Sequence, residues 1–360
     1  MLSELPKPVT RSRGSLPTVD VVIPCYNYAH FLSHCVDSVL TQRGVDVRVL
    51  IIDDHSPDDT PEVSARLARD PRVEARRHAV NQGHLATYNE GLLGWASADY
   101  TVLLSADDLL APGALARAAA VFDRDASIGM VYGRGVYYSD HEALPKTLSL
   151  PLGVTRWHGT EWIEGRCRSG HNVISSPEVV VRTSVQQRVG GYRPELPHAG
   201  DLEMWLRFAA VSDIAYVRGR PAAYYRVHEN SMLRTRFSAV LTDLEQRLAV
   251  FDHFFAEHPV LHGAPMMRAR AHRALAKEAL WAAVRAYDRD RVDEVPTAQL
   301  VDFALEVFGP AKSLPEYAAL RRRRALGAAV CGRTQLFAGS QVAKKAKNWL
   351  WWQSWKLRGV

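Results

Sequence analysis

The chain has 360 residues, of which 47% are hydrophobic and 23% charged, as is typical of a globular protein with one large domain and an appendage. Its net charge of +6 is unevenly distributed, because residues 321–360 contain ten Lys or Arg and no Asp or Glu, leaving 35 − 39 = −4 for residues 1–320. This distribution argues against a nucleic-acid-binding surface over the body of the protein, and we expect nucleic acid not to be a partner.

The chain opens with a Pro- and Arg-rich segment, residues 1–17, that we expect to be a flexible lead-in. It lacks the apolar core of a signal peptide, and no apolar run in the chain reaches the length of a membrane span. The four cysteines show neither metal-ligand spacing nor a disulfide framework pattern. These features predict a cytoplasmic protein.

Short β-branched runs and helical patterns then alternate. Strands are predicted at residues 19–24, 47–52 and 101–104, and helices at residues 30–42, 60–69, 85–95 and 112–122. Thr60-Pro61 has the form of an N-cap followed by proline at the first helical position. The alternation predicts an α/β fold with a mostly parallel central sheet, flanked by helices and joined by right-handed crossovers.

Polar residues follow each predicted strand at the edge where open α/β sheets place ligands. The three groups are Pro24-Cys25-Tyr26-Asn27, Asp53-Asp54 and Asp107-Asp108. Two adjacent carboxylates repel each other unless a cation lies between them, and hard oxygen ligands suit Mg²⁺ or Mn²⁺. The alternative for an isolated Asp-Asp pair is a solvated turn, but the convergence of three strand ends favours a ligand site.

The rest of the chain changes character twice. Residues 126–235 predict a mixed region with strands near 130–132 and 177–181 and a helix over 201–210, and residues 236–320 predict long amphipathic helices. We therefore expect a lead-in (1–17), a catalytic domain (18–235, with halves 18–125 and 126–235), a helical region (236–320) and a basic, Trp-rich tail (321–360).

Several motifs resemble those of the family 2 inverting glycosyltransferases, in the same order along the chain. They are Val21-Val22-Ile23-Pro24-Cys25-Tyr26-Asn27, Ile51-Ile52-Asp53-Asp54-His55-Ser56, Asn89-Glu90-Gly91, Leu104-Ser105-Ala106-Asp107-Asp108, Gly190-Gly191-Tyr192, His198-Ala199-Gly200-Asp201 and Arg226-Val227-His228-Glu229-Asn230-Ser231. The resemblance covers about residues 18–232. It implies a GT-A fold, a nucleotide-diphosphate sugar donor, a divalent metal ion (Mg²⁺ or Mn²⁺) and a single displacement with inversion.

The resemblance also implies roles for individual residues. Tyr26 would stack on the donor base and Asp54 would accept a hydrogen bond from it. Asp108 would bind the metal ion, with Asp107 toward ribose or phosphate, although either acid could be the direct ligand. Asp201 would be the general base. The remaining residues implied in donor binding are Pro24, Asn27, Asp53, Asn89 and Arg226, and His228 would approach the metal ion or the diphosphate.

Two positions depart from the family pattern. Ser105 stands where the metal motif usually has its first acid, and Gly200 stands where an acid usually precedes the base. Asp201 at the start of a helix also suits a plain N-cap, and Asp53-Asp54 a capped turn. The departures leave open a decayed nucleotide-sugar-binding scaffold as an alternative to the enzyme.

The expected enzyme transfers a sugar from a UDP- or dTDP-sugar to a hydroxyl group of a glycan or lipid-linked acceptor. An alternative acceptor is a peptide or a small natural product. The tail interleaves lysines with Trp349, Trp351, Trp352 and Trp355, a pattern that suits an anionic membrane surface at the inner face of the membrane. The alternative is a helix that packs its tryptophans on the catalytic domain or on the second subunit of a homodimer.

Overall fold

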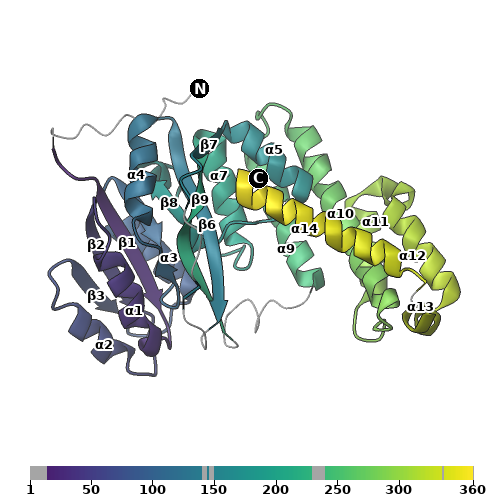
Figure 1. Cartoon of the computed structure of the whole chain (residues 1–360), viewed down its shortest axis with the longest axis horizontal. Helices are drawn as coiled ribbons and strands as arrows, with labels where there is room; N and C mark the ends of the chain where they lie inside the picture. The colour runs from purple at the N-terminus through teal and green to yellow at the C-terminus, as the bar shows by residue number, and fades with distance from the viewer. Residues whose placement is uncertain (1–13, 140–143, 146–149, 229–239, 335, 360) are drawn as a thin grey trace. The chain divides into compact units, whose positions relative to one another are not determined.

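The computed structural model describes residues 14–139, 144–145, 150–228, 240–334 and 336–359 (Figure 1). Most of the predicted lead-in, the end of the Arg226–Ser231 motif and the predicted boundary at residue 235 lie outside these ranges. The chain forms two compact units. The first comprises residues 1–162, 172–231 and 356–359, and the second residues 163–171 and 232–355.

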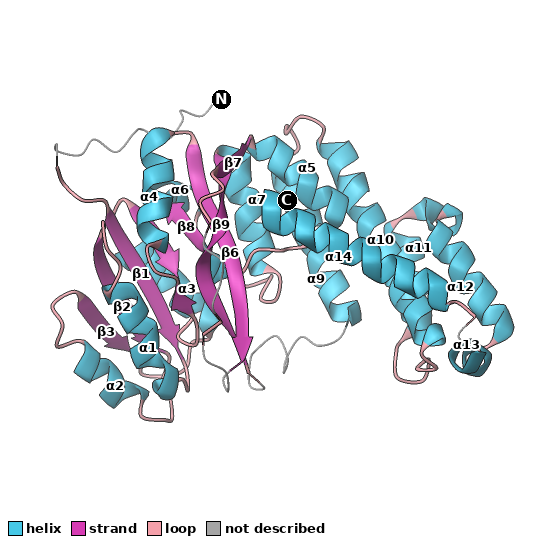
Figure 2. Ribbon diagram, in the orientation of Figure 1, coloured by secondary structure: helices cyan, strands magenta, loops and turns pink. Residues whose placement is uncertain are grey.

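The first unit is built on a sheet whose N-terminal half is parallel (Figure 2). Its strands are β1 (Thr18–Cys25), β2 (Asp46–Asp53), β3 (Val73–Arg77) and β4 (Tyr100–Leu103), in the order β3-β2-β1-β4. The three predicted strands are confirmed as β1, β2 and β4. Strand β3 was not predicted, because only Val73 of its five residues is buried.

The other half of the sheet is mixed. The order continues β4-β8-β6-β9-β5, with β8 antiparallel to both β4 and β6, β9 parallel to β6, and β5 antiparallel to β9. The bounds are β5 (Leu109–Leu110), β6 (Ile128–Ser139), β7 (Val154–Trp157, antiparallel to β9), β8 (Val179–Arg182) and β9 (Asp213–Val227). The prediction of an α/β fold with a parallel core is confirmed, and β9 carries the Arg226 motif at its end.

Helices cover both faces of this sheet. One face is covered by α1 (Ala29–Leu40), α2 (Thr60–Leu67) and α4 (Ala114–Arg124). The other carries α3 (His84–Asn89), a π-helix (Glu90–Trp95), α6 (Thr183–Val189) and α7 (Gly200–Val211), and the chain also forms α5 (Gly159–Ser169) and a 3₁₀ turn (Ser176–Glu178). The single helix predicted over residues 85–95 is therefore α3 continued by a π-helix.

The main core lies between the sheet and the α1–α4 face. Alternate residues of β1, Val19, Val21, Ile23 and Cys25, face this core, as a period of two requires. On the opposite face Gly91 allows close packing, since a Cβ atom there would lie 2.3 Å from Val22 Cγ1. The strands are thus fixed from both sides, and their carboxyl ends are held in register.

The second unit is helical (Figure 1). Its helices are α9 (Val240–Glu257), α10 (Ala264–Asp288), α11 (Thr297–Val307), α12 (Pro315–Leu326), α13 (Ala328–Thr334) and most of α14 (Ala338–Arg358). Seven alanines of α10 are buried, which allows neighbouring helices to approach closely. The predicted helical character of residues 236–320 is confirmed for the part that the structure describes, residues 240–320. Among the described residues, no helix is long and apolar enough to cross a membrane.

Candidate functional site

The carboxyl ends of β1 and β2 lie side by side, as parallel pairing requires. The backbone N–H of Asn27 donates to Ser56 Oγ (3.0 Å), and the N–H of Asp54 donates to Cys25 O (2.9 Å). Asn27 and His55 adopt left-handed backbone angles (φ 61° and 62°), which non-glycine residues seldom adopt outside functional turns. Tyr26 projects from this edge with 49% of its surface exposed.

Asp107 and Asp108 are held by the end of β9. The backbone N–H of Arg226 donates to Asp108 Oδ1 (2.9 Å), and Arg226 Nε donates to Asp107 O (2.8 Å). His228 Nε2 lies 3.0 Å from Asp107 Oδ2. Four residues predicted from separate motifs are therefore in direct contact.

Aromatic rings connect this cluster to the end of β1. The Arg226 guanidinium lies over the rings of Phe31 (4.3 Å) and Tyr138 (4.8 Å), and the His228 ring lies 5.4 Å from that of Tyr28. Stacking on rings fixes an arginine without neutralising it. The positive charge thus stays beside the two acids.

The charges at Asp107 and Asp108 suit a cation that brings further ligands. Burial and then the neighbouring Asp107 carboxylate raise the pKa of Asp108, opposed by its bond from the Arg226 backbone. Over the described residues, no three His, Cys, Asp or Glu side chains gather as a metal-binding group. Mg²⁺ commonly takes one or two carboxylates and completes its shell with water and substrate phosphate oxygens, so this pair of acids fits such an ion.

Asp201, the predicted base, lies in the first turn of α7. Its Oδ1 accepts a hydrogen bond from Tyr192 Oη (2.9 Å) and its Oδ2 one from Ser176 Oγ (3.1 Å). Burial raises the pKa of Asp201, and these two bonds partly offset the rise. At Gly200 a Cβ atom would lie 3.0 Å from Tyr192 Cδ1, so the glycine before the base leaves room for that tyrosine.

A further carboxyl group, Glu178, was not predicted. It ends the 3₁₀ turn that carries Ser176, and its Oε1 accepts a hydrogen bond from the Ser175 N–H (3.4 Å). Its Oε2 is buried without a hydrogen-bond partner. Burial, with Asp201 among the smaller causes, raises the pKa of Glu178 to about 8. No motif in the sequence marks this residue, because only folding buries it near Asp201.

Several tyrosines lie near both groups of acids. Tyr137 and Tyr225 are paired residues on β6 and β9 with ring centroids 5.1 Å apart, and Tyr137 is 57% exposed. Burial and then the charges of Asp108, Asp107 and Asp201 contribute to a raised pKa of Tyr225. The pKa of Tyr88 is also raised, with burial again the largest cause and the same three acids contributing. Asp107, Asp108 and Asp201 are therefore all within electrostatic range of Tyr88 and Tyr225.

Asp54 is held by hydrogen bonds from three groups of the protein. Its Oδ1 accepts bonds from Gln82 N (2.7 Å) and His78 Nδ1 (2.7 Å), and its Oδ2 accepts one from Gly83 N (2.8 Å). The carboxylate thus orders the turn before α3, and its role toward a donor base stays a prediction. Asp53 likewise supports its own loop, since its Oδ1 accepts a bond from Ser56 N (2.8 Å).

Asn89 forms hydrogen bonds within the protein, whereas the contacts of Pro24 indicate no particular role. Asn89 donates to Tyr192 O (2.8 Å) and accepts from Tyr192 N (2.6 Å), which fixes the residue that bonds Asp201. Tyr192 and Ser176, to which the sequence motifs assign no role, therefore support Asp201, the predicted base. Pro24 is half-buried at the end of β1. Contact with a donor stays a prediction for both Asn89 and Pro24.

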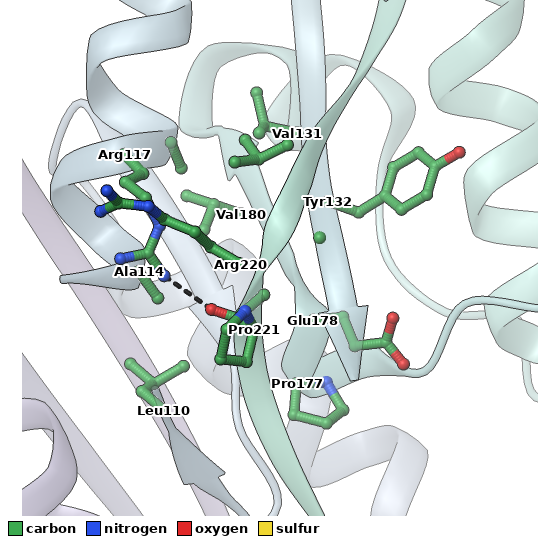
Figure 3. Close-up of a pocket in the computed structure, with 14 residues that line it drawn as sticks. Leu110, Ala114, Arg117, Val131, Tyr132, Pro177, Glu178, Val180, Arg220 and Pro221 are labelled. Carbon is green, nitrogen blue, oxygen red and sulfur yellow. Dashed lines mark hydrogen bonds between the residues drawn. The ribbon is translucent and has the colours of Figure 1, made fainter. Parts of the chain in front are cut away.

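A pocket lies between α4 and strands β6 and β9 (Figure 3). It is lined mainly by apolar side chains, among them Leu110, Val131 and Pro221, and Arg117 crosses it to donate to Pro221 O (2.6 Å). Glu178 is the one member of its lining that belongs to the acidic group described above. None of the residues predicted for donor, metal ion or base lines this pocket.

Comparisons with known proteins agree with the motifs. Residues 20–175 match the family model "Glycosyl transferase family 2". An uncharacterized protein of Mycobacterium tuberculosis is 27% identical over 215 residues, covering 56% of this chain and 65% of that protein. The chondroitin synthase of Pasteurella multocida is 36% identical over 118 residues, covering 32% of this chain and 12% of the synthase. The chain thus spans less than two thirds of either relative.

Solved structures share the fold. The Staphylococcus aureus TarS fragment 1–349 in complex with UDP-GlcNAc has a TM-score of 0.53 and 14% identity, covering 82% of this chain and 92% of TarS 1–349. The mannosyltransferase PcManGT of Pyrobaculum calidifontis, in complex with GDP-Man and Mn²⁺, has a TM-score of 0.52 and 17% identity, covering 96% of this chain and 89% of its own. At these identities the likeness establishes the architecture alone.

Proposed function

We propose that this chain, whose residues 20–175 match the glycosyl transferase family 2 model and which has the GT-A fold, transfers a sugar, with inversion, from a nucleotide-diphosphate sugar to a hydroxyl group. The observation that supports the proposal is that Asp107, Asp108 and Asp201 all lie within electrostatic range of Tyr88 and Tyr225. Acids from two separate motifs act on the same tyrosines. We place the donor diphosphate near Asp107 and Asp108 and the acceptor hydroxyl near Asp201.

In this proposal Asp201 removes the acceptor proton. A base in hydrogen-bond reach of the attacking oxygen is worth ~10²–10⁴-fold in rate. Two hydrogen bonds hold its carboxylate, leaving lone pairs on each oxygen for an acceptor. Its partial burial raises its affinity for the proton it must accept.

The donor would bind along the edge from Tyr26 to His228. Tyr26 offers an exposed ring for a base, and Asp107 or Asp108 would hold Mg²⁺ or Mn²⁺. When bound, such an ion stabilises the negative charge of a departing diphosphate. Arg226, fixed on two aromatic rings, adds positive charge at the same place. UDP or dTDP is the nucleotide we propose.

The acceptor would lie against the exposed ring of Tyr137, and we propose a glycan or a lipid-linked glycan. An aromatic face suits a sugar ring, and Tyr137 Oη lies 3.5 Å from Oγ of Ser175, the residue before the serine that bonds Asp201. Replacing Tyr137 by Ala should raise the KM for the acceptor, and Tyr137→Phe should not, because stacking needs the ring alone. Unchanged acceptor KM in Tyr137→Ala would place the acceptor elsewhere. A peptide or small-molecule acceptor would be identified by transfer of the sugar to that molecule when no glycan is present.

The decisive experiment compares Asp201→Asn with the wild type. We expect transfer to fall at least ~10²-fold while donor binding, measured by calorimetry with UDP- and dTDP-sugars and Mn²⁺, is kept. Lost donor affinity would mean that Asp201 only supports the fold. Donor binding by a wild type with no turnover and no donor hydrolysis would instead identify a nucleotide-sugar sensor.

A second variant tests the metal ion. Asp108→Ala should abolish the effect of Mn²⁺ on donor affinity, because it removes the more buried of the two acids. If Mn²⁺ still strengthens donor binding in Asp108→Ala, and this effect is lost only in Asp107→Ala, then Asp107 is the direct ligand.

A further inference from the structure

Helix α14 has two different faces, and its tryptophans are divided between them. On the inner side Lys344 Nζ lies 5.0 Å from the centre of the Trp281 ring of α10, and the Trp351 ring lies 6.4 Å from that of His171. Trp355 is also buried. The tryptophans that share this side therefore pack within the protein.

The other side has an apolar stripe in the open. Val342, Ala346, Trp349 and Leu350, here called the outer stripe, recur at intervals of four, seven and eight residues, which places them on one side of a helix. Val342 is 65% exposed, and Trp349 and Leu350 are each 61% exposed. Exposed apolar side chains gathered in this way indicate an interaction surface.

The charges around the outer stripe select the kind of partner. Lys345 and Lys347 are exposed and lie on either side of the stripe, and α14 contains no Asp or Glu. Indole rings favour the headgroup depth of a bilayer, and lysines beside them are attracted by anionic lipid. A protein partner of complementary charge would need an acidic surface. An anionic bilayer provides negative charge without one.

We propose that the outer stripe of α14, with Lys345 and Lys347, is a surface that binds an anionic lipid bilayer, with the helix lying in the plane of the membrane. Trp349 and Leu350 would enter the headgroup region, and the two lysines would contact lipid phosphates. This inference is independent of the proposed sugar transfer, because it depends on no residue of that site.

The test is sedimentation of the full chain with vesicles. We expect it to bind vesicles of equal parts phosphatidylglycerol and phosphatidylcholine about tenfold or more tightly than vesicles of phosphatidylcholine alone, and less tightly at high salt. Lys345→Gln with Lys347→Gln should weaken anionic binding about 25-fold, at about fivefold for each lysine. Trp349→Ala with Leu350→Ala should weaken it about tenfold or more.

The matched control removes two exposed apolar side chains from another place in the same unit. Val260→Ser with Met266→Gln changes residues that are 94% and 58% exposed and should leave vesicle binding unchanged. Circular dichroism should show that every variant keeps the wild-type helix content, since all of the changed residues are exposed.

A second measurement separates the two faces of α14. Lipids with brominated acyl chains should quench tryptophan fluorescence, and Trp349→Phe should reduce the quenching while Trp351→Phe should not. Failure of the wild type to bind either vesicle would overturn the proposal. So would a dimer, seen by light scattering, that Trp349→Ala with Leu350→Ala dissociates, because the stripe would then be an interface between two copies.

Discussion

At the scale of single residues, the proposed base is controlled by the groups around it. Burial raises the pKa of Asp201, and the hydroxyl groups of Tyr192 and Ser176 limit that rise by stabilising the carboxylate. A general base works only when deprotonated, so the pH below which activity is lost reports this balance. The two hydroxyl groups thereby set the acid side of the pH profile.

Removing one of these bonds should move the profile in a definite direction. Tyr192→Phe deletes the donor to Asp201 Oδ1, so the pKa of Asp201 should rise further and the acid limb of kcat/KM should shift to higher pH by about one unit. Tyr88→Phe is the control, since the structure shows no hydrogen bond from Tyr88 to Asp201. An acid limb that is the same in Tyr192→Phe and the wild type would show that Asp201 is not the group that titrates.

At the scale of elements, His78 joins the end of β3 to the π-helix. Its Nδ1 lies 2.7 Å from Asp54 Oδ1 and its Nε2 lies 2.8 Å from Glu90 Oε2. Burial lowers the pKa of His78, but the bonds to Asp54 and Glu90 outweigh burial and raise it above 6.5. Because Asp54 also holds the turn at residues 82–83, the His78 imidazole supports the segment from 78 to 90.

This arrangement predicts a pH-dependent contribution to stability. Since the folded-state pKa of His78 lies above its unfolded value, the contribution is fully present below the unfolded pKa and is lost as pH rises through the folded pKa. His78→Gln should therefore lower the free energy of unfolding by about 1–3 kcal/mol at pH 6, and by less at pH 9. Urea denaturation measures both values. His34→Gln, at an exposed site on α1, should show no such trend.

The connection from α6 to α7 depends on contact with α3. At Gly191 a Cβ atom would lie 2.3 Å from Asn89 Oδ1, within the pair of hydrogen bonds that fixes Tyr192. Gly191→Ala should therefore destabilise the protein by about 1–3 kcal/mol, as overpacking does. Gly94→Ala is the matched control, since a Cβ atom there meets no atom within 4 Å.

A double mutant shows whether the clash is the cause. If it is, Asn89→Ala with Gly191→Ala should cost less than the sum of the two single changes, as thermal or urea denaturation would report. Additive costs would mean that Gly191 is needed for another reason, such as the conformation of its backbone.

At the scale of the whole molecule, all four cysteines are buried as free thiols in the two units. Burial raises the pKa of both Cys25 and Cys167 to about 12, and it also raises that of Cys35 and Cys331. Thiols that are buried and protonated react slowly.

A disulfide reagent should therefore label the native protein slowly and react with four thiols after denaturation. Added nucleotide sugar should slow the native reaction further if the donor stabilises the first unit. Rapid labelling of a single thiol in the native protein would show that one of the two units opens locally.

The sequence by itself determined the parallel half of the sheet and the order of its motifs. Hydrophobic periodicity and the turn- or cap-forming residues that bound an element are local properties. The sequence alone therefore predicts β1, β2, β4, α1 and α7. The convergence of Asp107, Asp108, Arg226 and His228 followed from the motifs. The long β9 was missed because Gly219 and Pro221 interrupt its apolar pattern, and β3 because it is an edge strand.

Only the tertiary structure decided how the individual site residues are used. Asp54 and Asn89 have hydrogen-bond partners more than twenty residues away, and Glu178 gains its burial from strands that lie far from it in sequence. The two faces of α14 likewise depend on which side packs against α10. Pair contacts and desolvation are set by chain segments brought together in space, and no local pattern encodes them.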